Sequence, residues 1–185
     1  MFEHSPVQHV VPDVFVREAN DGSWHIELNS ETLPRVLINN SYVAEVGDKL
    51  QDKAAKEFLS DCLQSANWLT KSLDQRAQTI LKVAREIVKQ QDAFLVHGVR
   101  HLRPLTLKMV ADEIEMHESS VSRVTSNKYM MTPRGIFELK YFFTTGIGNA
   151  GDGESHSSES VRDQIKSLID AETADSILSD DAIVV

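Results

Sequence analysis

The chain has 185 residues, 41% of them hydrophobic and 25% charged, and its formal net charge is −9. This composition supports one or two small hydrophobic cores and excludes a wholly disordered chain. There is no charged and then apolar leader, no apolar run of about twenty residues and only one cysteine, which argues against secretion, membrane spanning and a disulfide framework and favours the cytoplasm.

The negative charge is concentrated at the two ends of the chain. Residues 1–48 carry two basic and eight acidic side chains (−6), and residues 149–185 carry two and nine (−7). Residues 49–148 carry fifteen basic and eleven acidic side chains (+4). The centre of the chain is therefore the part suited to a polyanionic partner.

Residues 1–48 are predicted to form a β-hairpin. Apolar residues alternate with polar ones in two runs: Val14 and Val16, then Trp24, Ile26 and Leu28. Asn20, Asp21 and Gly22 between the runs suit a tight turn with positive φ. The following stretch LPRVLINNSY, which contains Val36 and Ile38, is either a third short strand or an irregular arm.

Residues 49–98 are predicted to be helical, because they contain neither Gly nor Pro before Gly98 and are rich in strong helix formers. Apolar residues recur every three or four positions: Leu59, Leu63, Ala66, Leu69, Leu73, Ala77, Ile80, Ala84 and Ile87. Unbroken, the segment is about 70 Å long at 1.5 Å per residue. It is either two helices that fold back near Asn67 or one rod whose apolar stripe rests on a partner, and Gly98 is predicted to end it.

Residues 99–145 are predicted to form a helix-turn-helix. Thr106 suits the N-cap of a first helix, Met116 and His117 interrupt it, and a second helix follows. The inward faces of the two helices carry these residues: Leu107, Val110, Ala111 and Ile114, then Val121 and Val124. Pro133 and Gly135 predict a turn, after which the apolar run to Phe143 completes the core of the two helices.

The outer face of the second helix carries short polar side chains around one long cation. The candidate DNA-binding residues are Ser119, Ser120, Ser122, Arg123, Ser126 and Asn127, with Lys128 and Arg134 beside them. Short side chains let the backbone approach a duplex, and Arg can pair with guanine O6 and N7 together. Lys128 and Arg134 are expected to contact phosphates. A solvated helix without this function would also be polar here, and Glu115 occupies a turn position where such motifs often carry Gly.

Catalytic and metal sites find little support in the sequence. His97 and His101 are separated by the helix-ending Gly98 and have no third ligand at a useful spacing. Cys62 is predicted to be a buried core thiol, and no glycine-rich phosphate loop occurs. We expect no enzyme activity, no cofactor and no metal.

HESSVSRVTSNKYMMTPRGIFELKYFF, residues 117–143, resembles the sigma-54 family of bacterial transcription initiation factors. VVPDVFVRE, WHIELNSETLPRVLIN and ANWLTKSLDQRAQTILKVAREIV resemble segments of that family in the same order, and SSESVRDQIKSLIDAE follows. The resemblance implies a mainly α protein that binds core RNA polymerase and promoter DNA near the start-proximal element. It also implies an ATP-dependent activator as partner and a place in the bacterial nucleoid.

The resemblance further implies that residues 49–97 are the family's extra-long helix and residues 118–128 its promoter-proximal recognition helix. It predicts a fragment that lacks the activator-contacting N-terminal region and the arginine-rich RpoN box. The expected divisions are 1–48, the β-hairpin end of the core-binding region; 49–98, the long helix; 99–145, the helix-turn-helix; 146–158, a flexible linker; and 159–185, a truncated start of the RpoN-box domain. The alternative is a protein-interaction module that binds polymerase or activator and uses the helix-turn-helix only as scaffold.

Overall fold

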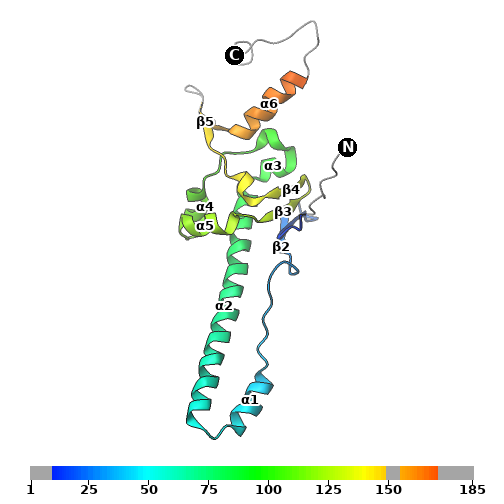
Figure 1. Ribbon diagram of the computed structural model, residues 1–185. Helices are drawn as coiled ribbons and strands as arrows, with labels where there is room; N and C mark the ends of the chain where they lie inside the picture. The colour runs from blue at the N-terminus through cyan, green and yellow to red at the C-terminus, as the bar shows by residue number, and fades with distance from the viewer. Residues whose placement is uncertain (1–9, 149–154, 171–185) are drawn as a thin grey trace, which may run out of the picture.

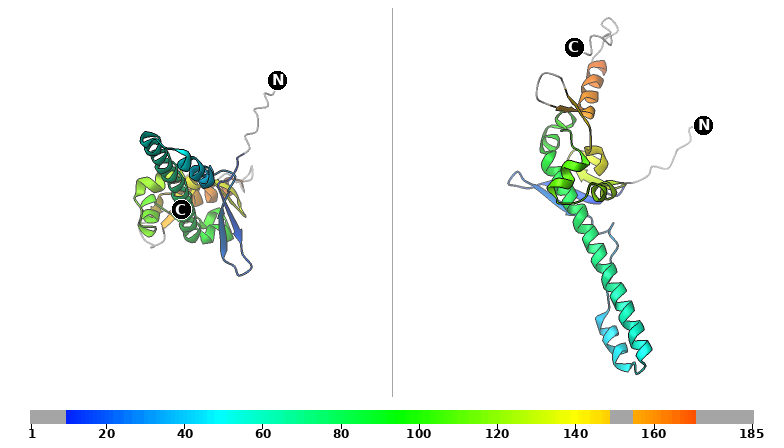
Figure 2. Two further views of the ribbon diagram at one scale, coloured as in Figure 1. Left: turned by 90° about the horizontal axis from the view of Figure 1, so that it is seen from below. Right: turned by 90° about the vertical axis from the view of Figure 1, so that its left-hand side faces the viewer.

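The computed structural model describes residues 10–148 and 155–170. A long helical rod carries a mixed body of helices and strands at one end (Figure 1). The rod is α2 (Lys53–Gln90), and α1 (Asn40–Lys49) lies beside its N-terminal end in both views of Figure 2. The expected mainly α fold with an N-terminal hairpin and a long helix is confirmed. Of the expected linker and last domain, residues 149–154 and 171–185 lie outside the described residues.

A four-stranded sheet joins segments that are far apart in the sequence. Its strands are β1 (Val14–Glu18), β2 (Trp24–Leu28), β3 (Tyr129–Thr132) and β4 (Gly135–Glu138), in the order β2-β1-β3-β4. The pairs β1–β2 and β3–β4 are antiparallel hairpins, whereas β1 and β3 are parallel, with Val14 opposite Met130. The sheet therefore combines residues from the expected 1–48 and 99–145 divisions in one body.

The turn of the first hairpin is the one predicted. Gly22 has φ of 79°, and the Asp21 carboxylate accepts hydrogen bonds from the Ser23 amide (3.0 Å) and hydroxyl (2.6 Å). The alternative of a third strand at Val36 and Ile38 is wrong, because residues 33–39 are irregular and lead into α1. Asn39 caps α1 by accepting from the Tyr42 amide, so the chain becomes helical there and does not add a strand to the hairpin.

α2 runs unbroken through Asn67, which excludes the alternative of two helices. Asp52 caps its start by accepting from the Ala54 amide. Its buried apolar residues all lie in the C-terminal part: Ile80, Val83, Ala84, Ile87 and Val88. The rod is thus anchored in the body by its last three turns, and the rest projects away from it (Figure 2).

A buried glutamine marks the end of α2. Gln91 is 1% exposed, and its side-chain amide donates to the Arg103 carbonyl (2.8 Å) and accepts from the Arg103 amide (3.0 Å). The helix resumes as α3 (Asp92–His97), which Gly98 ends with φ of 97°. The predicted stop at Gly98 is therefore confirmed as the end of α3. The long helix α2 itself ends at Gln90, with Gln91 as its C-cap.

Aromatic side chains from β4 and from the short helix η2 (Leu139–Phe142) complete the core. Phe94 of α3 packs edge-to-face against Phe137 and Phe142, with ring centroids 5.4 Å apart in each case. The predicted contribution of this apolar run to the core, and the predicted turn before it, are confirmed. The strands β3 and β4 were not foreseen.

The last described helix, α6 (Ser158–Asp170), packs against the short helix η1 (Val99–His101). Arg100 lies 3.4 Å from the Asp163 carboxylate and donates to the Ser167 hydroxyl (2.9 Å). Burial, and then the carboxylates of Glu159 and Asp163, raise the pKa of Tyr141. α6 is thus held to η1 at specific points.

β5 (Gly146–Gly148) and β6 (Ser155–Ser157) form an antiparallel pair within the expected linker. Cys62 is exposed on the projecting part of α2, so the prediction of a core thiol is wrong: the core begins further along the helix. No helix among the described residues is both long and apolar enough to cross a membrane.

Candidate nucleic-acid interface

Two short helices follow the body's core in the predicted order. α4 (Leu107–Glu113) begins at Thr106, whose hydroxyl accepts from the Met109 amide (3.2 Å) as an N-cap should. Val110 and Ala111 face the core and are almost completely buried. α4 packs on both α2 and the next helix, so all three helices fix one another.

The turn after α4 has the geometry of a helix C-terminus closed by a left-handed residue. Glu115 has φ of 55°, its amide donates to the Asp112 carbonyl, and the Met116 amide donates to the Ala111 carbonyl (2.9 Å). This is the Schellman arrangement, in which glycine is the usual residue. Glu115 thus occupies a position whose backbone conformation favours glycine, in agreement with the expectation that such motifs often carry Gly there.

The second helix, α5 (Glu118–Thr125), begins with a histidine cap. His117 accepts from the Ser119 amide through Nδ1 (3.2 Å), and the Ser119 hydroxyl lies 2.8 Å from the same nitrogen. Glu118 in the first turn is favoured by the positive end of the helix. The inner face buries Val121 and Thr125, and the Thr125 hydroxyl is satisfied by the Val121 carbonyl.

α5 ends at Thr125, three residues before the predicted end at residue 128. Ser126 has extended backbone, and Asn127 adopts the left-handed conformation with φ of 53°. The Asn127 amide donates to the Glu138 carboxylate, and the Leu139 amide donates to the Lys128 carbonyl. The chain leaves the helix early because it must enter β3.

The structure brings the candidate residues of α5 to one outward surface. Ser119 and Arg123 are exposed, and Ser120 and Ser122 are half-buried. Ser126 is exposed beyond the helix end, and its hydroxyl donates to the Ser122 carbonyl (2.8 Å). Among the described residues, the side chains of Ser120, Ser122 and Arg123 make no hydrogen bond or ion pair within the protein.

The two cations predicted to contact phosphates have partners inside the protein. Lys128 Nζ lies 3.0 Å from the Asp13 carboxylate, with Lys128 23% and Asp13 9% exposed at the side chain. Arg134 donates through Nε to the Leu95 carbonyl (3.0 Å) and through Nη2 to the Val96 carbonyl. Arg134 therefore lies at the C-terminal end of α3, where a cation also complements the helix dipole.

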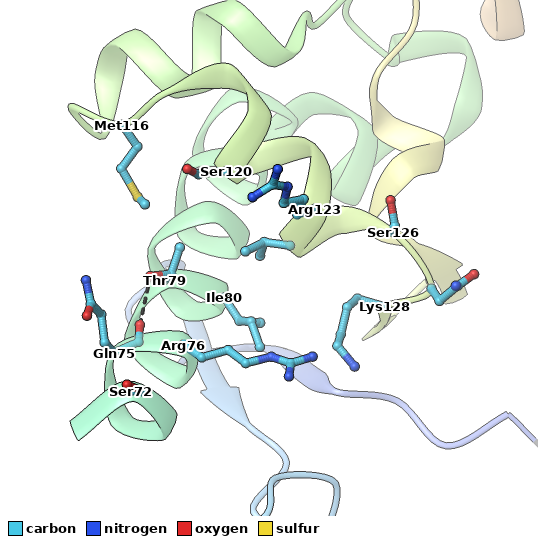
Figure 3. Close-up of a pocket in the computed structure, with 12 residues that line it drawn as sticks. Ser72, Gln75, Arg76, Thr79, Ile80, Met116, Ser120, Arg123, Ser126 and Lys128 are labelled. Carbon is cyan, nitrogen blue, oxygen red and sulfur yellow. Dashed lines mark hydrogen bonds between the residues drawn. The ribbon is translucent and has the colours of Figure 1, made fainter. Parts of the chain in front are cut away.

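A groove of about 590 Å³ lies between α2 and α5. Figure 3 shows Arg76 projecting from α2 into the space below α5, with Arg123 and Lys128 nearby. None of its twelve described lining residues is Asp or Glu. The α2 contribution, Ser72, Gln75, Arg76 and Thr79, was missed in the sequence, because only tertiary packing places that part of the rod beside α5.

Two acidic residues of the neighbouring helices pair with a lysine. Glu113 of α4 and Glu86 of α2 lie 3.0 Å and 3.5 Å from Lys89. The Glu113 hydrogen bond, with the charges of Glu86 and Glu113, raises the pKa of Lys89. Within residues 10–148 and 155–170, no three metal-ligating side chains come together.

α4, its closed turn and α5 thus define a helix-turn-helix protein, and the comparisons assign its family. The family model "Sigma-54, DNA binding domain" matches residues 56–185, and "Sigma-54 factor, core binding domain" matches residues 1–42. The chain belongs to the sigma-54 family.

Curated relatives and a solved structure agree with this family assignment. An RNA polymerase sigma-54 factor of Azorhizobium caulinodans is 67% identical over 96% of this chain, and that of Sinorhizobium fredii is 64% identical over 99%. The chain spans only 35% and 36% of these relatives. The crystal structure of Aquifex aeolicus sigmaN bound to promoter DNA matches 90% of this chain and 48% of its own, with a TM-score of 0.60 and 26% identity.

Proposed function

We propose that this chain acts in transcription initiation as part of a sigma-54-type factor, binding promoter DNA at the start-proximal element and contacting core RNA polymerase. The observation that carries the proposal is α5, which buries Val121 and presents Arg123 and Ser120 to a groove whose described lining residues include no Asp or Glu. The match to a DNA-binding model over this region, and a similar protein bound to promoter DNA, support it.

α5 is the recognition helix in this proposal. Ser119, Ser120 and Ser122 are short enough to let the backbone approach the major groove, and Arg123 is long enough to reach a base edge. Ser126 and Asn127, beyond the helix end, are placed to meet the sugar–phosphate backbone. Arg134 has a structural part, because its guanidinium holds the end of α3.

The role is non-enzymatic. The relatives are named as RNA polymerase sigma factors, and no catalytic group is needed for a subunit that selects DNA. We further infer an ATP-dependent activator as a partner of the whole factor, and the bacterial cytoplasm at the nucleoid as its place of action.

One substitution tests the DNA proposal. Arg123→Ala should cost roughly 1 to 3 kcal/mol in binding to the preferred promoter and flatten the preference at one base pair, because a bidentate base contact is lost. Fluorescence anisotropy of the 185-residue chain with promoter and scrambled duplexes, at two salt concentrations, measures both effects. Lys140→Ala, which removes an exposed cation from η2 outside the groove, is the matched control.

If Arg123→Ala leaves affinity and sequence preference unchanged, the recognition helix is only a scaffold. A role in protein binding is then favoured by the projecting end of the rod, where Tyr42, Phe58 and Trp68 are 64%, 71% and 69% exposed. Binding of core RNA polymerase through such a surface should respond weakly to salt, whereas binding of DNA should weaken steeply.

A further inference from the structure

The segment that leaves the recognition helix is held by a residue from the opposite end of the described chain. Asp13 precedes β1, 115 positions from Lys128, and its carboxylate Oδ1 lies 3.0 Å from Lys128 Nζ. Its other oxygen, Oδ2, accepts from the Tyr129 amide (3.0 Å). The Asp13 carboxylate thus binds the side chain of Lys128 and the backbone amide of Tyr129, shortly after the end of α5.

Asp13 is itself fixed from both sides. Its amide donates to the Tyr129 carbonyl (2.8 Å), which extends the parallel pairing of β1 and β3. Its carbonyl accepts from the Asn29 amide (2.8 Å), and the buried Asn29 side chain donates to the Pro12 carbonyl (2.9 Å). The carboxylate therefore has little freedom to follow Lys128 if Lys128 moves.

The pair is also shielded from solvent. Side-chain exposure is only 9% for Asp13 and 23% for Lys128, so salt screens this pair less than a surface pair. Breaking one partner of a sheltered pair leaves the other charge uncompensated. The contact should therefore persist at salt concentrations that release DNA phosphates.

The location gives the pair a role in recognition. Lys128 lines the groove beside α5 together with Arg123, and only Ser126 and Asn127 separate it from the last residue of the helix. Asp13 lies in the segment that matches the core-binding model, and Lys128 in the segment that matches the DNA-binding model. A displacement of Asp13 thus acts directly on the exit of the recognition helix.

We propose that Asp13 is a positioning residue for the recognition helix, acting through Lys128. In this proposal the Lys128 ammonium group pairs with Asp13 and does not contact a DNA phosphate. This deepens the proposed function and rests on it. It also revises the sequence-based expectation that Lys128 contacts phosphate.

Three variants of the 185-residue chain test the proposal: Asp13→Asn, Lys128→Met and the double variant. The promoter-to-scrambled affinity ratio should fall in all three, by roughly two- to ten-fold, because α5 loses its fixed exit. The slope of log affinity against log salt should stay unchanged in Lys128→Met. It should steepen by about one in Asp13→Asn, because the freed Lys128 can reach a phosphate, and return to the original value in the double variant.

Glu18→Gln is the matched control for removal of a negative charge near β1. Glu18 is exposed at the end of β1, and this variant should change neither ratio nor slope. A slope lowered by about one in Lys128→Met would show a phosphate contact and overturn the proposal. An unchanged ratio and slope in Asp13→Asn would overturn it equally.

A measurement without DNA separates this proposal from the proposed function. Each single variant should lower the melting temperature, and the double variant should lie no lower than Asp13→Asn, because the two residues stabilise through one contact. Strictly additive shifts would show that the residues are uncoupled. If the unmodified chain binds no DNA while the shifts are non-additive, the pair stands and the proposed DNA-binding function fails.

Discussion

Two residues with left-handed backbone flank the recognition helix. Glu115 (φ 55°) closes the turn before α5, and Asn127 (φ 53°) lies just after it. Asn tolerates this conformation because its short polar side chain can bond locally, whereas Glu has no such compensation. The two positions fix the angle at which α5 enters and leaves the body.

Glu115→Gly should increase the free energy of unfolding by up to about 1 kcal/mol, because glycine adopts positive φ without the steric cost of a Cβ. Urea denaturation followed by circular dichroism measures the change. Lys82→Gly, at an exposed helical position of α2, is the matched control and should lower the free energy by about 1 kcal/mol. A loss of stability in Glu115→Gly would mean that the side chain, and not the backbone, matters at this turn.

At the scale of elements, the second hairpin holds α3 in place. The β3–β4 turn carries Arg134, whose guanidinium donates to two carbonyls in the last turn of α3, while Phe137 of β4 packs on Phe94. Through the sheet, the same hairpin holds the exit of α5. A short ribbon of eight paired residues, four in each strand, thus connects two helices that the sequence separates by twenty positions.

Arg134→Met should lower the free energy of unfolding by about 1 kcal/mol, because two charge-assisted hydrogen bonds are lost at a partly solvated site. The salt slope of DNA binding should stay the same. Thermal denaturation and binding titrations measure the two effects, with Arg134→Lys as the control that keeps the charge but cannot form both bonds in a fork. A slope lowered by about one, with stability unchanged, would instead assign Arg134 to a phosphate.

At the scale of the whole molecule, the protein is a body with a projecting rod. The buried residues of α2 begin at Ile80, and before them the helix is half-buried at most, with α1 beside its start and residues 33–37 beside residues 70–77. Helical stability in proteins comes mostly from packing of an apolar face, so the projecting part should open more readily than the anchored part.

Amide hydrogen exchange should therefore show a gradient along α2. Amides of residues 57–72 should exchange markedly faster than those of residues 80–88, because local opening of the projecting turns exposes no body core. Mass spectrometry of exchanged peptides measures the gradient, and α5, which is short but packed on two helices, serves as the internal reference. Uniform protection along α2 would show that the projecting stripe is covered, for example by a second copy of the chain.

The sequence by itself determined the elements whose cause is local. Gly22, Thr106 and Gly98 predict a turn, a helix start and a helix end through their own backbone and side-chain chemistry. The polar outer face of α5 followed from helical periodicity, which placed Val121 and Val124 inward. Val121 is buried and Val124 half-buried, whereas the burial of Thr125 was not predicted. The family resemblance rested on long ordered stretches of the same kind, and the comparisons confirmed it.

Only the tertiary structure decided what depends on distant partners. The four-stranded sheet, the groove between Arg76 and α5, and the ion pair of Asp13 with Lys128 join residues 44 to 116 positions apart, and no local pattern encodes such pairing. Whether residues 49–97 form one helix or two was ambiguous for the same reason, because the apolar stripe has the same spacing in two packed helices as in one projecting rod. Lys128 and Arg134 looked free in the sequence, but Asp13, just before β1, and the Leu95 and Val96 carbonyls of α3 decide where their charges are used.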